Sequence, residues 1–179
     1  MKLKLIGCKV LLREVYLLAA TCPNVVDTLW LRQALHNEPE KLRRTLQAAI
    51  DWVEDEDETY DAILLGYGLC SNGIVGIKSR KTSLVVPRAH DCITLMIGSK
   101  ERYQKEFDAH SGGIYWYSPG WIEHSVQPGK ERFEMIYNEY AEKYGEDNAQ
   151  YLMEMEQSWM RKYKYAIYID WLELPYPQY

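Results

Sequence analysis

Three cysteines and one histidine occupy similar places in the alternation of apolar and polar segments. Cys8, Cys70 and Cys92 each stand where an apolar, strand-like run gives way to a turn or a helix, and His90 lies two residues before the third cysteine. In an open α/β sheet these places are the carboxyl ends of the strands, where loops gather and ligands bind. Thiols and an imidazole together can hold a soft metal ion or activate a thiolate. We therefore expect these residues to form a metal site.

The short segment around His90 combines three chemically useful side chains. Asp91 can cap a helix over residues 92–97, which places Cys92 in the first helical turn. The helix dipole and the free amides there are expected to lower the pKa of the thiol. Asp91 can also orient the His90 ring, because a metal-bound histidine generally holds its second nitrogen on a carboxylate or a carbonyl. The alternative is that Asp91 only caps the helix and that His90 is half exposed.

Zinc fits this set of donors best, because it accepts three cysteines and one histidine in tetrahedral geometry. The C-x₂-C spacing of zinc fingers is absent. The spacings typical of iron–sulfur proteins are also missing, so iron or an iron–sulfur cluster is the weaker alternative. Cys22 follows a predicted helix and precedes a strand, which places it at the opposite end of the sheet. His36, at the end of the second strand, can join the site or serve as a cap or surface residue.

A glycine-rich segment over residues 66–73 surrounds the second cysteine. Gly68, Asn72 and Gly73 are candidates for binding a cofactor, because glycine lets the backbone turn tightly or approach a ligand. Trp121, which follows a later strand, can form a flat wall for a planar ligand. The G-x-G-x-x-G order of dinucleotide-binding proteins fails at Ser71, and no P-loop lysine follows. The alternatives are a purely structural turn and a tryptophan that covers the edge of the core.

Apolar runs alternate with helical patterns along the chain. Strands are predicted at 3–8, 27–31, 61–67, 83–87, 114–117 and 163–172, and helices at 10–20, 39–53, 92–97, 99–107 and 129–162, with an interruption near 144–147. The acidic run 54–58 is expected to be a solvated helix end. This alternation indicates an α/β fold with a single open, mostly parallel sheet of the doubly wound, Rossmann-like kind, with helices on both faces. Residues 1–179 are predicted to form one domain.

Composition excludes several classes of function. The chain has 179 residues, of which 47% are hydrophobic, and a net charge of −5. The scattered Lys and Arg residues argue against nucleic-acid binding. No run approaches the roughly 20 apolar residues that span a bilayer, and the start lacks the apolar core of a signal peptide. A cytoplasmic protein without membrane association is therefore expected, with cysteines not paired in disulfides. The 15 Tyr and 6 Trp suit half-buried surfaces, so a homodimer is one expectation.

Several motifs together resemble those of a known family. They are Gly7-Cys8, Leu35-His36-Asn37-x-Pro39-Glu40, Tyr67-Gly68-Leu69-Cys70-x-Asn72-Gly73, Arg88-x-His90-Asp91-Cys92-Ile93, Gly98-Ser99, Tyr117-Ser118-Pro119-Gly120-Trp121 and Glu142-Lys143-Tyr144-Gly145. They resemble the family called domain of unknown function 1638. The resemblance implies an association with corrinoid-dependent methyltransferase systems, and no established activity. The resemblance also implies that members continue further after the last strand, whereas this sequence ends at Pro175-Tyr176-Pro177-Gln178-Tyr179, so a lid or partner surface is expected to be missing here.

The function expected from these residues is metal binding, with zinc held by three cysteines and a histidine at the carboxyl ends of the strands. Combined with the resemblance, this implies thiol- or corrinoid-linked methyl transfer, with a small-molecule substrate or a corrinoid protein as partner. A zinc-bound thiolate accepts a methyl group because the metal keeps it deprotonated at neutral pH. Two alternatives are a metal-free thiol enzyme, with Cys92 as nucleophile and His90 as base, and a non-catalytic module that binds a cofactor or partner.

Overall fold

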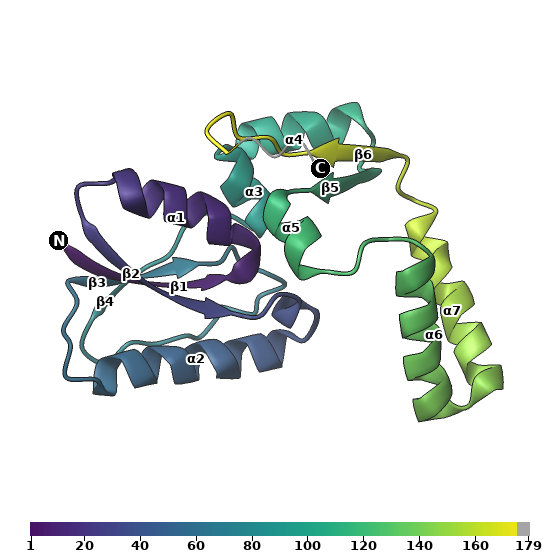
Figure 1. The fold of residues 1–179 in the computed structure, drawn as a ribbon, viewed down its shortest axis with the longest axis horizontal. Coiled ribbons are helices and arrows are strands. Elements are labelled where there is room, and N and C mark those ends of the chain that lie inside the picture. Colours follow the sequence, from purple (N-terminus) through teal and green to yellow (C-terminus); the bar gives the residue numbers. More distant parts are fainter. Residues whose placement is uncertain (175–179) are drawn as a thin grey trace. The chain divides into compact units, whose positions relative to one another are not determined.

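The computed structural model describes residues 1–174, which Figure 1 shows as a ribbon. Residues 175–179 lie outside the described part, so the expectation about a lid or partner surface after the last strand stays an expectation. The chain divides into two compact units, Met1–Tyr103 with Asp170–Tyr179, and Gln104–Ile169. The prediction of one domain over the whole chain stays a prediction, and each unit is described by itself. Within residues 1–174, no helix is both long and apolar enough to cross a membrane.

The first unit is built on a parallel sheet of four strands in the order β2-β1-β3-β4. The strands are β1 (Lys2–Cys8), β2 (Val25–Leu31), β3 (Ala62–Gly66) and β4 (Ser83–Val85). Helix α1 (Leu12–Thr21), preceded by the 3-10 turn η1 (Lys9–Leu11), covers one face of the sheet. Helix α2 (Pro39–Asp55), preceded by η2 (Leu35–Asn37), covers the other (Figure 1). The predicted α/β class and the open, Rossmann-like sheet are confirmed.

The core of this unit lies between the sheet and α2. Ile6 of β1 and Ile63 of β3 are fully buried in neighbouring strands. Four side chains of α2 spaced at three or four residues are also buried: Leu42, Leu46, Ile50 and Val53. This spacing places them on one face of the helix, because an α-helix repeats every 3.6 residues. Burial of each such side chain is worth about 1.5–3 kcal/mol, so this face holds α2 on the sheet.

Two short helices follow the four-stranded sheet in the sequence. Helix α3 spans Cys92–Ile97, and α4 spans Lys100–Ala109. Both start where the sequence predicts. The Asp91 carboxylate accepts a hydrogen bond from the Thr94 amide at 2.7 Å, and the Ser99 hydroxyl accepts one from the Arg102 amide at 3.1 Å. These side-chain caps satisfy amides that have no partner inside the helix.

The second unit contains a parallel pair of strands and a helical hairpin. Strand β5 (Ile114–Tyr117) pairs with β6 (Tyr165–Tyr168) in a sheet of their own, so these two predicted strands do not join the four-stranded sheet. Helix α5 (Pro119–His124), which the sequence analysis did not predict, is capped by Ser118. Helices α6 (Lys130–Tyr144) and α7 (Glu146–Met160) are separated at Gly145, whose φ of 84° ends α6. The predicted interruption near 144–147 is confirmed.

One carboxylate fixes the start of β4 to the end of α2. The Glu54 side chain is buried and accepts hydrogen bonds from the amides of Arg80, Lys81 and Thr82 at 2.7–2.8 Å. The Ser79 hydroxyl donates another at 2.6 Å. These bonds hold the pKa of Glu54 at about 2, although burial alone would raise it. The expectation that residues 54–58 form only a solvated helix end is therefore wrong for Glu54.

Replacing Glu54 by Gln is expected to lower the free energy of unfolding by about 2–3 kcal/mol, because the amide nitrogen cannot accept the bonds that the second carboxylate oxygen accepts. Urea denaturation at pH 7 measures the loss. Glu56→Gln, which changes an exposed carboxylate two residues away, is the matched control.

The stability that Glu54→Gln loses relative to the wild type should also depend on pH. Glu54 contributes stability above its unfolded pKa of 4.5, and that contribution fades as the pH falls from 4.5 towards 2. A difference between the wild type and Glu54→Gln that stays constant over this range would contradict the assignment.

Candidate functional site

The two central strands end side by side in closely packed glycines. Gly7 of β1 pairs with Gly66 of β3, and a Cβ added to Gly66 would lie 2.9 Å from the Gly7 Cα. Cys8 and Tyr67 are the residues that follow these glycines, and both are buried. Because the strands are parallel and in register, both residues stand at the carboxyl edge of the sheet. The first predicted ligand, Cys8, is therefore where the sequence places it.

The second cysteine lies in a turn of unusual backbone conformation. Cys70, Ser71 and Asn72 have φ values of 47°, 55° and 63°, so three consecutive residues with side chains lie in the left-handed region. This region is unfavourable for residues other than glycine, and such strain is often found at functional sites. The turn closes with the Gly73 amide donating to the Cys70 carbonyl at 3.0 Å. From α2, the Arg43 guanidinium donates to the Asn72 carbonyl at 3.1 Å.

This turn is bound to the segment that carries the third cysteine. The amide of Leu69 donates to the carbonyl of Ala89 at 2.8 Å, and the amide of Cys70 donates to the carbonyl of His90 at 2.9 Å. Gly68 lies against the same segment, since a Cβ there would be 2.5 Å from the Asp91 nitrogen. Two stretches about 20 residues apart in the sequence are thus held together through their backbones.

Asp91 performs both roles that the sequence left open. Its Oδ1 accepts hydrogen bonds from the amide and the hydroxyl of Thr94 at 2.7 and 2.8 Å, which caps α3. Its Oδ2 lies 3.2 Å from Nδ1 of His90, whose ring packs edge-on against Tyr103 with 4.9 Å between centroids. The His90 side chain is 49% exposed. With Nδ1 next to a carboxylate, Nε2 is the His90 nitrogen suited to a metal ion.

Burial controls the thiols of this site. It raises the pKa of Cys8, and it raises the pKa of Cys70 to about 11. The pKa of Cys92 is also raised by burial, then by the negative charges of Cys8 and Cys70. The expectation of a lowered pKa for Cys92 is therefore wrong, because desolvation outweighs the start of a helix of only six residues. Without a metal ion, these thiols keep their protons at neutral pH.

His36 reaches the same edge from the loop after β2. Burial lowers its pKa, and the negative charge of Asp91 partly opposes the shift. The Asp91 carboxylate thus contacts the His90 ring, and its charge raises the pKa of His36 from a second loop. A neutral imidazole at pH 7 can accept a proton or bind a metal ion.

The three predicted cysteine ligands influence one another electrostatically but do not form a finished metal site. Among the described residues, no group of three or more His, Cys, Asp or Glu side chains is positioned to hold a metal ion. All four cysteines are free. Gly73 has a packing explanation, since a Cβ there would lie 2.5 Å from the tip of Leu42. Trp121 belongs to the second unit, where its ring packs edge-on against Tyr115 at 6.1 Å.

Two polar residues of the first unit were not predicted as part of the site. The Tyr67 hydroxyl is buried and has no hydrogen-bond partner within the described part of the chain. The pKa of Tyr67 is raised by burial and then by the charges of Cys8, Cys70 and Cys92. The Gln33 amide, two residues after β2, is also buried without a partner there. The sequence shows Tyr67 only as the last residue of the strand predicted at 61–67 and gives no sign that its hydroxyl lacks a partner.

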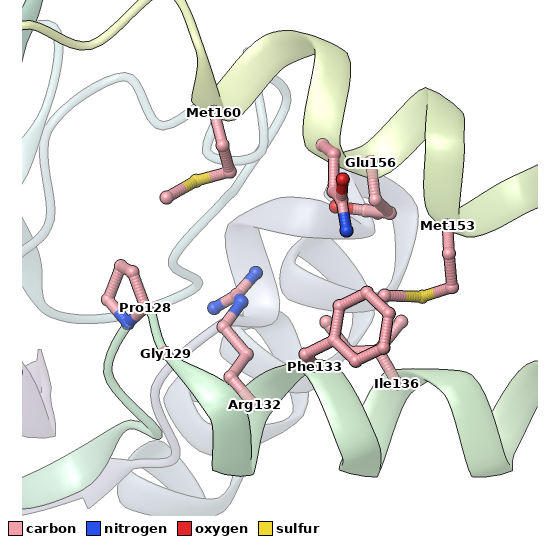
Figure 2. A pocket seen from close by; sticks show the side chains of 9 residues that line it. Pro128, Gly129, Arg132, Phe133, Ile136, Met153, Glu156 and Met160 are labelled. Carbon is pink, nitrogen blue, oxygen red and sulfur yellow. The ribbon is translucent and has the colours of Figure 1, made fainter.

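A pocket in the second unit contains none of the predicted ligands. It has a volume of about 150 Å³ and lies between α6 and α7 (Figure 2). Figure 2 shows Arg132 of α6 reaching into it beside Met160 of α7. The rest of the lining is largely apolar: Pro128, Gly129, Phe133, Ile136, Met153, Glu156 and Gln157. The hairpin also exposes Phe133, Met135, Tyr151 and Met155. This surface is largely apolar, and no cysteine lines the pocket.

Comparison with known proteins identifies the family. A family model described as "Protein of unknown function (DUF1638)" matches residues 30–178. The chain belongs to the DUF1638 family. The matched range includes Cys70, His90 and Cys92, while Cys8 precedes it. No curated protein and no solved structure matches the chain.

The contact between Gly68 and Asp91 leads to a first prediction for the site. Gly68→Ala is expected to lower the free energy of unfolding by about 1–3 kcal/mol, because the new methyl group meets backbone atoms and must push the two segments apart. Chemical denaturation measures this loss. Gly129→Ala is the control, since a Cβ there meets nothing within 4 Å. Equal stability of the two variants would contradict the described packing.

The raised pKa values predict slow thiol chemistry in the metal-free protein. Alkylation of Cys70 by iodoacetamide should increase with pH up to about 11, so that at pH 8 its rate is about 1,000-fold below the limit. Cys92 should need still higher pH. Peptide mass spectrometry at each pH gives both rates. Cys8→Ser, which removes a neighbouring charge, should shift both profiles to lower pH. A Cys92 profile with its midpoint below the ordinary thiol value of 9.0 would instead support a metal-free nucleophile.

Proposed function

We propose that this DUF1638 protein binds a soft divalent metal ion, zinc in the first place, through the thiolates of Cys8, Cys70 and Cys92. The observation that carries the proposal is the gathering of three free thiols at one edge of the sheet, where the charge of Cys8 raises the pKa of Cys70, and the charges of Cys8 and Cys70 raise that of Cys92. A bound dication removes the disadvantage of buried thiolates, because its charge offsets both their desolvation and their mutual repulsion.

The fourth ligand is proposed to be Nε2 of His90 or a substrate molecule. His90 fits because its Nδ1 already faces Asp91, the arrangement that orients metal-bound histidines. The ligands are proposed to close around the ion as it binds, because the described residues show no formed metal site and the thiols must lose their protons to bind. The strained turn at Cys70 supports this step, since its backbone is not in a relaxed state. Iron, alone or in a cluster, is the less favoured metal.

The reaction proposed for the site is methyl transfer to or from a metal-bound thiolate. A small thiol substrate would occupy the fourth position on zinc, while a corrinoid protein would supply or receive the methyl group. The wider setting in this proposal is a cytoplasmic protein that binds neither nucleic acid nor membranes. A homodimer is supported by the apolar side chains that the α6–α7 hairpin exposes.

A second candidate is a non-catalytic module that binds a small polar ligand without a metal. The buried amide of Gln33 favours it, because both its nitrogen and its oxygen are without a partner among the described residues. A ligand with a neighbouring donor and acceptor would satisfy both atoms. The third candidate, a metal-free thiol enzyme, is less favoured because burial keeps Cys92 protonated.

The proposal predicts about one zinc ion per chain in protein purified without a histidine tag, measured by elemental analysis. Cys70→Ser and Cys92→Ser should weaken zinc binding by more than about 100-fold, given that loss of even an outer hydrogen bond costs 10- to 100-fold. Both variants should still fold, as measured by circular dichroism. Cys22→Ser is the matched control and should bind like the wild type.

Calorimetry adds a second measurement. Because the thiols are protonated at pH 7, binding should release close to one proton for each cysteine ligand. Comparison of buffers with different ionisation enthalpies gives this number. A wild-type chain that retains no zinc, or a Cys70→Ser variant with unchanged zinc content, would rule out the proposed ligands.

A further inference from the structure

The pocket between α6 and α7 is formed by one face of each helix. Each helix contributes four lining residues at positions i, i+3, i+4 and i+7, a spacing that brings side chains together on one side of a helix. They are Gly129, Arg132, Phe133 and Ile136 at α6, and Met153, Glu156, Gln157 and Met160 on α7. All of them belong to the second unit, so the pocket is complete within that unit.

The two ends of the pocket differ in chemistry. Figure 2 shows Phe133 and Ile136 beside Met153 at one end, which is apolar. Towards the other end, the guanidinium of Arg132 is directed into the pocket beside Met160. The pocket thus offers an apolar surface and a positive charge to the same occupant.

The Arg132 guanidinium has no hydrogen bond and no ion pair with any side chain that the structure describes. The residue is partly buried, and a cation beside apolar walls is unfavourable without a partner. Glu156 lines the same pocket, but its Oε1 accepts a hydrogen bond from the Tyr140 hydroxyl at 3.2 Å. The arginine therefore has its donors available for an anion from outside the chain.

The size of the pocket limits what this anion can be. Its volume of about 150 Å³ is that of an apolar cavity that holds one benzene molecule. Close-packed proteins contain few voids much larger than a water molecule. Pockets for drug-sized ligands and cofactors have roughly 300–1,000 Å³, so a nucleotide is too large. The volume suits one aromatic ring or a short branched chain.

We propose that the α6–α7 pocket binds a small carboxylic acid anion with a single apolar group of about the size of benzene. Arg132 would hold the carboxylate, because the planar guanidinium matches both carboxylate oxygens and donates charge-assisted hydrogen bonds. Phe133, Ile136 and Met153 would contact the apolar group. This site is separate from the three cysteines, so the inference does not rest on the proposed metal binding.

The test titrates the full, metal-free chain, labelled with ¹³C in the methionine methyl groups, with benzoate. An aromatic ring in the pocket should shift the signals of Met153 and Met160, which line it. Met96, in the first unit, should keep its signal, as should Met135 and Met155, which are exposed and do not line the pocket. Benzoate should bind about tenfold tighter than benzyl alcohol, its neutral counterpart, because only the carboxylate pairs with the guanidinium.

Arg132→Gln should weaken benzoate binding by about tenfold or more and leave the affinity for benzyl alcohol unchanged. Lys130→Gln is the matched control, since it removes the same charge from an exposed position two residues away. Its affinity for benzoate should equal that of the wild type. Circular dichroism checks that both variants fold, and the comparison of probes on the wild type needs no variant.

Three results would each overturn the inference. One is equal affinity of the wild type for benzoate and benzyl alcohol, which includes binding of neither. Another is a benzoate shift as large at the exposed Met135 and Met155 as at Met153, which would show non-specific contact with the outer surface. The last is tighter binding of benzylamine than of benzoate, because it would assign the pocket to a cation held by Glu156.

Discussion

The backbone contact between the turn after β3 and the segment after β4 is the constraint on which the site depends. Strand β4 has only three residues, yet the hydrogen bonds from Leu69 to Ala89 and from Cys70 to His90 continue the pairing past its end. Gly68 is required for this approach, because no side chain fits between it and Asp91. Cys70 and Cys92 owe their proximity to these contacts. Main-chain hydrogen bonds between these two segments therefore position the cysteine side chains.

Desolvation and charge act in the same direction on this cluster. Each thiol is partly or fully removed from water, and each thiolate that forms makes the next one less favourable. A metal-free chain resolves the conflict by keeping the protons. A dication would resolve it by neutralising the sulfurs, which is the physical basis of the proposed metal binding. The neutral His36 and the carboxylate of Asp91 complete a set of groups whose charges depend on one another.

The sequence predicts the elements of this fold well, because the apolar patterns are local. The buried run of β3 and the caps at Asp91 and Ser99 are visible in a few consecutive residues. What it fails to predict depends on distant partners. Glu54 stands in an acidic run, and only the loop at Ser79–Thr82 reveals that it is a buried anchor. The pairing of β5 with β6 likewise depends on segments about 50 residues apart.

The same limit applies to the site. Strand ends place the three cysteines at one edge, which the register of β1 and β3 bears out for Cys8. The pKa of Cys92 could not be predicted from its place in a helix, because burial is a property of the assembled fold. Tyr67 was overlooked for the same reason: its importance lies in the absence of a partner, and a sequence shows residues without showing which of them remain unpaired.

The amino and carboxyl ends of the strands in the four-stranded sheet carry different kinds of ionisable group. At the amino edge, carboxylates are held in their charged form: Glu54 by amides, and Glu58 by Lys2 and Tyr60. At the carboxyl edge, thiols are held neutral. Low pH therefore destabilises the end of the sheet where the carboxylates lie, because it protonates Glu54 and Glu58. High pH acts on the opposite end, because it deprotonates the thiols. Near neutrality the carboxylates at one end are charged and the thiols at the other are protonated, so neither end of the sheet changes its charge there.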